Sequence, residues 1–214
     1  MALNELSYAP GTAPPSPKPE VTHAMRELTL EVAFENAWTE ETAVRIADMF
    51  SSMAADWTAG HDNPGRDALL HDALDRGNNG QRVSGERALE LGSGTGLGTR
   101  ELAKRFPQVI ALDRSQGMLE EAPAEYGPRV LADAAALPVQ ARSIDVLVLV
   151  NMILFPAEAD RVLSPGGSLV WINTFGEHTP IHLTADEVDR ALPGEWNTTH
   201  SRAGTGTWAV SQRK

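Results

Sequence analysis

The chain has 214 residues, of which 42% are hydrophobic and 22% charged, as in soluble globular domains with a sizeable core. It has no cysteine, which excludes a disulfide scaffold, thiol catalysis and thiolate-bound metal centres. The 18 basic and 29 acidic residues give a net charge of −11, and such a surface repels nucleic-acid phosphates and anionic lipids. We therefore expect neither a nucleic-acid nor a membrane partner.

The first twenty residues contain five prolines and little that could pack against a core. This composition predicts a flexible tail over residues 1–20. A basic segment followed by an apolar one, typical of a secretory signal, does not occur there. The longest apolar run, around Val146–Val150, is far shorter than the ~20 residues of a membrane helix. A cytoplasmic location is the resulting expectation.

Residues 21–85 are expected to form an N-terminal helical cap. Apolar side chains recur every three or four residues between Ala43 and Trp57, which predicts an amphipathic helix from Thr39. A second helix is expected over Arg66–Arg76, before a break at residues 77–80. Both helices are predicted to close over a ligand held by the rest of the chain.

Residues 86–214 alternate short apolar segments with helical ones. Strands are expected at Arg87–Leu91, Val109–Leu112, Arg129–Ala132, Ile144–Val150, Ser168–Ile172 and around Thr205–Ser211, with helices at Leu97–Phe106, Gln116–Glu125, Ala157–Leu163 and from Thr184. This alternation is typical of an α/β fold with right-handed crossovers. We predict a Rossmann-like, doubly wound, mostly parallel sheet of about seven strands.

Polar residues follow the predicted strands at their carboxyl ends. Glu90 lies at the end of the first strand, before a glycine-rich turn, while Asp113, Asp133, Asn151 and Asn173 end the next four. Ligands of open parallel sheets bind outside the carboxyl ends of the strands, near the point where the strand order reverses. These residues therefore predict one ligand-binding crevice.

The glycine-rich turn runs Glu90-Leu91-Gly92-Ser93-Gly94-Thr95-Gly96. A dinucleotide fingerprint G-x-G-x-x-G fails in both registers, because its last position falls on Leu97 or Thr99. No Lys-Ser/Thr pair follows, which excludes a Walker-type phosphate loop. The pattern that fits is acidic-x-G-x-G-x-G.

With this pattern the chain resembles the class I S-adenosylmethionine-dependent methyltransferases, in particular bacterial small-molecule enzymes of the ubiquinone and menaquinone methyltransferase superfamily. The resemblance covers residues 87–172. Its pieces occur in order: Ala88–Gly96, Ala111–Ser115 with Met118-Leu119, Ala132–Ala134 before Leu137-Pro138, Ser143–Asp145, and Arg161–Gly167.

The resemblance implies S-adenosylmethionine as cofactor and S-adenosylhomocysteine as product. It places the methionine part on the glycine-rich turn, the ribose hydroxyls on Asp113, and the adenine on Asp133 and the Ala134 N–H. The residues expected to bind the cofactor are Glu90, Leu91, Gly92, Ser93, Gly94, Gly96, Asp113, Arg114, Met118, Asp133, Ala134 and Asn151. Asp145 opens its strand at the other end of the sheet and is expected to be structural.

Methyl transfer requires an acceptor held in line with the methyl group, and a general base only if the acceptor must lose a proton. Weak candidates for such a role are Asn151, His178 and His182. Trp57 and His61, on the predicted cap helix, are expected to line the acceptor pocket, with packing roles as the alternative reading. No metal site is predicted. The acceptor is expected to be a small molecule, and the protein to be a monomer or homodimer.

Other functions remain open on the sequence. A fold of this kind also supports enzymes that keep the cofactor without methylating, such as cyclases, and proteins that sense S-adenosylmethionine. A sensor would bind the cofactor with no open acceptor pocket beside its methyl group. A nicotinamide-dependent oxidoreductase fits less well, because of the glycine spacing.

Overall fold

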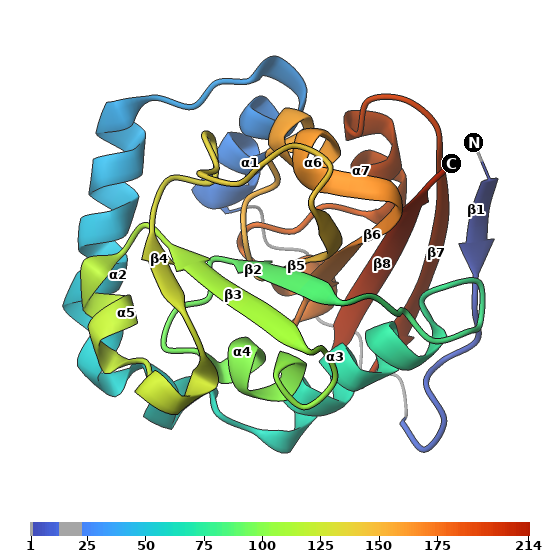
Figure 1. Cartoon of the computed structure of the whole chain (residues 1–214), viewed down its shortest axis with the longest axis horizontal. Coiled ribbons are helices and arrows are strands. Elements are labelled where there is room, and N and C mark those ends of the chain that lie inside the picture. The colour runs from blue at the N-terminus through green and yellow to red at the C-terminus, as the bar shows by residue number, and fades with distance from the viewer. Residues whose placement is uncertain (1, 13–22) are drawn as a thin grey trace.

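The computed structural model describes residues 2–12 and 23–214 (Figure 1). The helices are α1 (Ala24–Glu35), α2 (Glu40–His61), α3 (Pro64–Arg76), α4 (Leu97–Leu102), α5 (Gln116–Glu121), α6 (Pro156–Val162) and α7 (Ala185–Ala191), with 3-10 turns η1 (Ala124–Tyr126) and η2 (Gly176–His178). The strands are β1 (Ala2–Glu5), β2 (Arg87–Leu91), β3 (Gln108–Asp113), β4 (Arg129–Leu131), β5 (Ile144–Val150), β6 (Leu163–Asn173), β7 (Trp196–Ala203) and β8 (Gly206–Arg213).

The strands form one sheet in the order β1-β7-β8-β6-β5-β2-β3-β4. The five strands from β6 to β4 run parallel, whereas β8 is antiparallel to both β6 and β7. Because β3 and β5 flank β2 on opposite sides, the strand order reverses at the carboxyl end of β2. The predicted Rossmann-like, mostly parallel fold is confirmed, and the glycine-rich turn lies at the reversal point.

Strand β1, which was not predicted, corrects the prediction of a tail over residues 1–20. Ala2–Glu5 pairs in parallel with β7, in register from Ala2 opposite Asn197 to Glu5 opposite His200. Beyond the strand, the Ala9 N–H donates to the carbonyl of Arg202 at 2.9 Å, and the Ala9 side chain is buried. This pairing joins segments almost at the two chain ends, so local composition could not reveal it. The remaining residues of that predicted tail, 1 and 13–20, lie outside the described residues.

Helices cover both faces of the sheet. On one face, α3 and α4 pack through Leu69, Leu74 and Leu102 against alternate side chains of the strands, such as Val148 and Val170. On the other face, α1, α6 and α7 pack around Leu147, Leu149 and Trp171, with side chains that include Val32, Val162 and Val188. The near-continuous apolar run of β5 is explained by this two-sided burial.

The three N-terminal helices therefore do not act as one cap. The predicted helix at Arg66–Arg76 exists as α3, but its apolar face packs against the sheet, and only its first turn, at Arg66, reaches the ligand-binding side. The helix α1 was not predicted. It begins at a histidine N-cap, His23, and ends at Asn36 in a left-handed conformation, and neither residue is a strong helix boundary signal.

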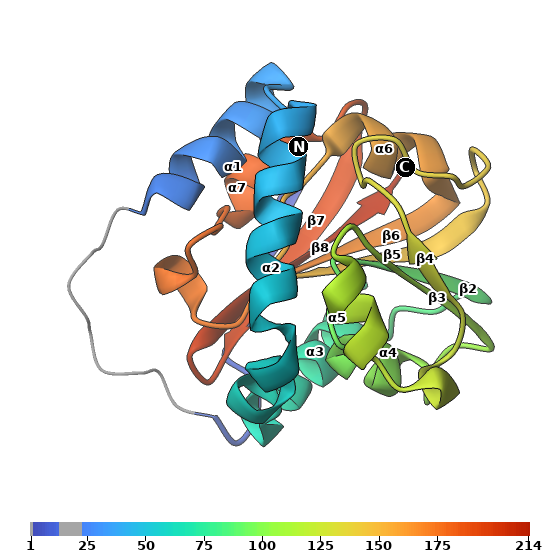
Figure 2. The same cartoon turned by 90° about the vertical axis from the view of Figure 1, so that its left-hand side faces the viewer.

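Of these three helices, α2 contributes the most side chains to the wall of the ligand-binding side. It stands upright in front of the sheet, with α5 beside it (Figure 2). The two helices approach closely, since a Cβ on Gly117 would lie 3.0 Å from the Cα of Ser51, and the hydroxyls of Ser51 and Ser115 are hydrogen-bonded at 2.8 Å. Thr39 caps the first turn of α2 through the Thr42 N–H, and the helix thus begins where the amphipathic pattern predicted it.

Within residues 2–12 and 23–214, no helix is both long and apolar enough to cross a membrane. The same part of the chain holds no group of three or more histidine or acidic side chains arranged to bind a metal ion.

Candidate active site

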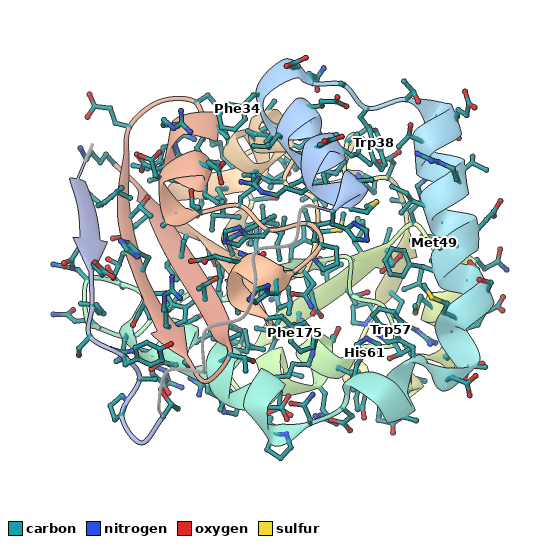
Figure 3. All side chains as sticks on the ribbon, turned by 180° about the vertical axis from the view of Figure 1, so that it is seen from behind. Phe34, Trp38, Met49, Trp57, His61 and Phe175 are labelled. Carbon is teal, nitrogen blue, oxygen red and sulfur yellow. The ribbon has the colours of Figure 1, made fainter. Side chains whose placement is uncertain are left out.

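A crevice of about 440 Å³ lies at the carboxyl ends of β2, β3, β5 and β6, with α2 along one wall. Figure 3 views the molecule from the side of this crevice, with Trp38, Met49, Trp57 and Phe175 around its opening. The strand ends contribute Gly92–Thr95, Asp113–Ser115, Ala132–Ala134 and Val150–Ile153. We refer to the part of the crevice at Gly92–Thr95, Asp113–Ser115 and Ala132–Ala134 as the loop half. The apolar half is the part lined by α2, Met152, Ile153, Phe155, Phe175 and Thr179–Ile181.

The glycine-rich turn requires its three glycines. Gly92, Gly94 and Gly96 have φ angles of +66°, +55° and +85°, in the region that side chains other than glycine rarely adopt. A Cβ on Gly92 would lie 2.6 Å from the sulfur of Met152, and one on Gly96 would lie 2.9 Å from the ring of Tyr126. On Gly94 the nearest atom would be the indole nitrogen of Trp57, at 3.8 Å. The backbone at Gly94 is thus the open, crevice-facing part of the turn.

Asp113 fixes this turn and also lines the crevice. Its carboxylate accepts hydrogen bonds from the Gly94 N–H and from the Ser115 N–H, both at 2.8 Å. Burial raises the pKa of Asp113 above its ordinary value, while these backbone N–H groups oppose the shift. The Asp113 carboxylate thus belongs both to the turn and to the crevice wall, and its contact with a ribose stays a prediction.

Glu90 differs from the prediction, because its carboxyl lies beneath the turn and not on the crevice wall. It is 1% exposed, and Oε2 accepts a hydrogen bond of 2.5 Å from the Thr99 hydroxyl. A Cβ on Gly98 would lie 2.0 Å from Oε1, so α4 can cover this carboxyl only with glycine there. Burial raises the pKa of Glu90 to about 7. Leu91, which is in the core, and Gly96 also lie outside the crevice wall.

Asp133 lines the crevice, and its carboxylate already accepts three hydrogen bonds from other residues of the protein. Oδ2 accepts from the indole N–H of Trp38 at 3.1 Å and from Arg114 at 2.9 Å, and Oδ1 accepts from the Ala135 N–H at 2.8 Å. Arg114 also pairs with Glu40, at the start of α2. Met118 and Ala134 line the same region, as predicted. Trp38, from the α1–α2 connection, was missed, since no local pattern shows that it reaches Asp133.

Trp57 and His61 both line the crevice, as predicted for the acceptor pocket. Their rings are stacked 3.7 Å apart at an interplanar angle of 10°, and Phe50 meets Trp57 edge-on at 5.5 Å. The Nδ1 of His61 lies 2.8 Å from the carbonyl oxygen of Trp57, so it carries the proton and donates, because a carbonyl only accepts.

The apolar half contains many side chains that sequence reasoning did not assign to a site. They share large, flexible or aromatic apolar surfaces: Met25, Ile46, Met49, Phe50, Met53, Met152, Ile153, Phe155, Phe175 and Ile181. The signal for those on α2 was the amphipathic stripe, which predicted the helix correctly. A stripe shows that one face is covered, but not whether a ligand or the core covers it.

The three weak catalytic candidates do not meet in the crevice. Asn151 lines it, with φ of +52°, but both amide atoms bond to Thr174, at 2.8 and 2.9 Å. His182 is buried and faces a separate cavity of about 250 Å³, and burial lowers its pKa to about 4. His178 is exposed on η2 and lies outside the crevice wall. The placement of both histidines near the crevice was wrong, because the turn after β6 presents Phe175 and Thr179–Ile181 instead.

Comparison with known proteins identifies the central part of the chain. Residues 89–171 match the family model described as a methyltransferase domain. The chain is 39% identical over 107 residues to the biotin biosynthesis bifunctional protein BioHC of Cellvibrio japonicus (strain Ueda107), a match that covers 45% of this chain and 21% of that protein. It is 39% identical over 92 residues to the demethylmenaquinone methyltransferase of Corynebacterium efficiens, covering 40% of each. The chain thus spans well under half the length of these curated relatives.

The fold is shared with solved methyltransferase structures. The DhpI–SAH complex superposes with a TM-score of 0.61 at 19% sequence identity, over 78% of this chain and 94% of that one. At this level of identity the likeness concerns the fold alone. It supports the Rossmann-like fold described above.

Proposed function

Because residues 89–171 match the family model of a methyltransferase domain, we propose that the protein transfers a methyl group from S-adenosylmethionine to a small-molecule acceptor. The observation that carries the proposal is the loop half of the crevice. There the open backbone at Gly94, the carboxylate of Asp113 and the strand reversal point coincide.

The residues of the loop half fit the cofactor. Ser93 Oγ is buried without a hydrogen-bond partner in the described residues, and it belongs to the crevice wall. The proposed roles follow the resemblance: the turn around Gly94 holds the methionine part, and Asp113 accepts the ribose hydroxyls. Two of the acceptor sites of Asp113 are used by backbone N–H groups, and a carboxylate offers about four.

The proposed adenine site is at Asp133 and the Ala134 N–H. Trp38 and Arg114 already bond to Asp133 Oδ2, and this arrangement places the indole of Trp38 beside the proposed adenine position. An adenine amino group would use the remaining acceptor capacity of the carboxylate. Trp38 also packs edge-on against Phe155 at 5.2 Å, which closes this end of the crevice with apolar surface.

The cofactor supplies a methyl group activated by a positively charged sulfur. The protein's contribution is to orient the acceptor and to exclude water, and positioning of this kind accounts for a large share of such rates. The α2 wall and the aromatic pair Trp57–Phe50 supply the dry surface.

We propose further that the acceptor has an apolar body. Three of the large apolar side chains that are exposed in the described residues, Met49, Met53 and Phe175, belong to the crevice wall. Exposed apolar surface at a pocket mouth is typical of a binding site. Among the relatives, a demethylmenaquinone methyltransferase is named for an acceptor of this kind. An open apolar half beside the loop half favours transfer over sensing.

The first experiment is calorimetric titration with S-adenosylmethionine, S-adenosylhomocysteine and, as control, NADH. Micromolar binding of the two adenosyl compounds without binding of NADH is the expected result. Absence of binding of both adenosyl compounds would contradict the proposal. Methyl transfer is then measured with naphthoquinols and with a malonyl thioester, and transfer to the malonyl thioester alone would contradict an apolar acceptor.

The cytoplasmic location, the absence of a nucleic-acid partner and the choice between monomer and homodimer stay predictions. So does the exact set of residues that bind the cofactor.

A further inference from the structure

A second cavity, of about 250 Å³, lies over the strands β1, β7, β8 and β6, which are side by side in Figure 1. The turn after β6 divides it from the crevice. Phe175 and Thr179–Ile181 belong to the crevice wall, whereas Glu177 and His182–Asp186 belong to the wall of this cavity. We call it the hairpin cavity, because the β7–β8 hairpin forms part of its floor. The proposed methyl transfer does not use it.

The register of the strands explains why the sheet leaves a hollow here. One row across the four strands consists of Glu5, His200, Ala209 and Trp171. Residues opposite one another in neighbouring strands point to the same face of the sheet. Ala209 is therefore the small side chain between an imidazole and an indole, and all four residues belong to the cavity wall. The floor of the hairpin cavity follows from this sequence of large and small side chains.

The wall of the hairpin cavity contains polar groups that no other described residue satisfies. Five buried side-chain atoms of the described residues lack a hydrogen-bond partner, and three of them belong to wall residues: Trp171 Nε1, Asn173 Oδ1 and Thr207 Oγ1. The ring of His182 makes no hydrogen bond in the same part of the chain, and burial lowers its pKa to about 4, so at pH 7 it offers one donor and one acceptor. Proteins keep few buried polar groups without partners, because each costs free energy. Their concentration around one cavity indicates a site for a polar ligand.

The charged groups of the wall leave one carboxylate unpaired. Glu177 pairs with Arg202 at 2.6 Å, and Asp186 pairs with Arg190 of α7 at 2.9 Å. Glu5, on the edge strand β1, is exposed and makes no ion pair in the described residues. Arg202 is the single arginine or lysine among the described wall residues, so no cation there is free to bind an anion. The hairpin cavity therefore favours an uncharged or positively charged ligand.

A matching ligand both donates and accepts hydrogen bonds, and hydroxyl groups do both. The cavity is smaller than the roughly 300–1,000 Å³ of pockets for drug-sized ligands, so its ligand is about the size of a monosaccharide. We propose that the hairpin cavity binds a small polyhydroxylated amine. Its hydroxyl groups meet Trp171, Asn173 and Thr207, and its ammonium group lies toward Glu5. This site is separate from the crevice, and its ligand need not take part in methyl transfer.

The first test is calorimetric titration at pH 7 with glucosamine, glucose and glucuronate, which share a sugar ring and differ in charge. Glucosamine should bind, glucose should bind up to about fivefold more weakly, the range for an exposed ion pair, and glucuronate should bind most weakly. In Glu5→Gln, glucosamine should lose its advantage over glucose. Binding of none of the three sugars would overturn the proposal, and so would binding of glucuronate as tightly as glucosamine.

Thr207→Val locates the binding, because it keeps the shape of the side chain and removes its hydroxyl. Glucosamine affinity should fall about 3- to 10-fold, the range for a lost hydrogen bond, while the melting temperature should not fall, because the hydroxyl has no partner in the described residues. Thr198→Val is the matched control. The Thr198 hydroxyl bonds to Asp189 at 2.7 Å and to Ser211 at 2.9 Å, and Thr198 is outside the cavity wall.

The control should therefore melt at a lower temperature and keep its glucosamine affinity. Unchanged glucosamine affinity in Thr207→Val would overturn the proposal, since the sugar would then bind elsewhere. Both variants should bind S-adenosylhomocysteine as the wild type does. The sugar titrations do not depend on the cofactor, so failure of the proposed methyl transfer and failure of this proposal are distinguishable.

Discussion

The two halves of the crevice are built in different ways. In the loop half, the Asp113 carboxylate accepts hydrogen bonds from the Gly94 and Ser115 N–H groups, and three glycines with positive φ fix the backbone. The apolar half is made of side chains from α2, the end of β5 and the turn after β6, which meet only through packing. A preorganised polar site can hold one ligand tightly, while flexible methionines and a half-exposed Phe175 can adapt to varied shapes.

The difference implies that damage in one half should not spread to the other. Each of the following predictions changes one of the two halves, or the support beneath the glycine-rich turn, and compares the result with a matched variant or condition.

The largest effect is expected for Gly96→Ala. At φ of +85° an alanine is strained, and its Cβ would lie 2.9 Å from the Tyr126 ring. We expect the free energy of unfolding to fall by about 2–4 kcal/mol and cofactor affinity to be largely lost. Gly80→Ala is the control, since Gly80 has the same φ with open space around it. It should cost only about 1–2 kcal/mol of strain and keep the affinity, and equal affinities in the two variants would contradict the role of the turn.

Asp113→Asn tests the carboxylate of the loop half. It removes an acceptor from the Gly94 or Ser115 N–H and from the proposed ribose, so S-adenosylhomocysteine binding should weaken by about 1–3 kcal/mol. Asp145→Asn is matched, because Asp145 also accepts two backbone N–H bonds, from Glu86 and Arg87, at the other end of the sheet. Both variants should melt at lower temperature, but only the first should bind the cofactor more weakly.

Glu90→Gln tests whether the buried carboxyl beneath the glycine-rich turn makes the stability of the protein depend on pH. The folded pKa of Glu90 is raised to about 7, so the folded state holds this proton more tightly than the unfolded state. Its stabilising contribution is complete below the unfolded value of about 4.5 and is lost as pH rises through about 7. The wild-type protein and Glu90→Gln are each denatured at pH 5 and at pH 8. Between these pH values, the free energy of unfolding of the wild type should fall by an additional amount on the order of 2 kcal/mol that the variant does not lose. Comparing the two proteins at each pH cancels other titrating groups, including His182. Parallel pH profiles would contradict the raised pKa.

Phe175→Ser should have the smallest effect, and only on the apolar half. Removing part of the apolar wall should raise the KM of an apolar acceptor about fivefold, or about 1 kcal/mol, and leave S-adenosylhomocysteine binding unchanged. Leu131→Ser is the control: Leu131 and Phe175 are both 55% exposed, but Leu131 is not part of the crevice wall. A similar change of KM in both variants would mean that Phe175 does not contact the acceptor.

Most of the sheet could be predicted from the sequence, because the central strands are apolar runs that end in polar groups. β1 and β7 could not, since β1 is stabilised by a partner almost 200 residues away and β7 carries mostly polar residues. The helix predicted from Thr184 is present as α7, and its start is recognisable from the sequence because its capping box joins Thr184 and Glu187, which are only three residues apart.

The residues of the candidate site likewise divide into those that the sequence could predict and those that it could not. The glycine-rich turn, Asp113 and Asp133 were identifiable, because strand ends converge in any parallel sheet. Trp38 and Arg66 were not, because their positions depend on how α1, α2 and α3 pack around the sheet. Glu90 had the expected place in the motif, but the direction of its side chain follows the pleat of β2, which points it beneath the turn.

The sequence by itself determined the fold class, the turn of three glycines and the order of polar strand ends, because these depend on local backbone preference and on alternation along each strand. Only the tertiary structure decided which helix covers the crevice, which histidines face away from it, and which buried polar atoms of the described residues are left without a partner. These features arise when distant segments compete for the same space and the same charges, and no local pattern records the outcome of that competition.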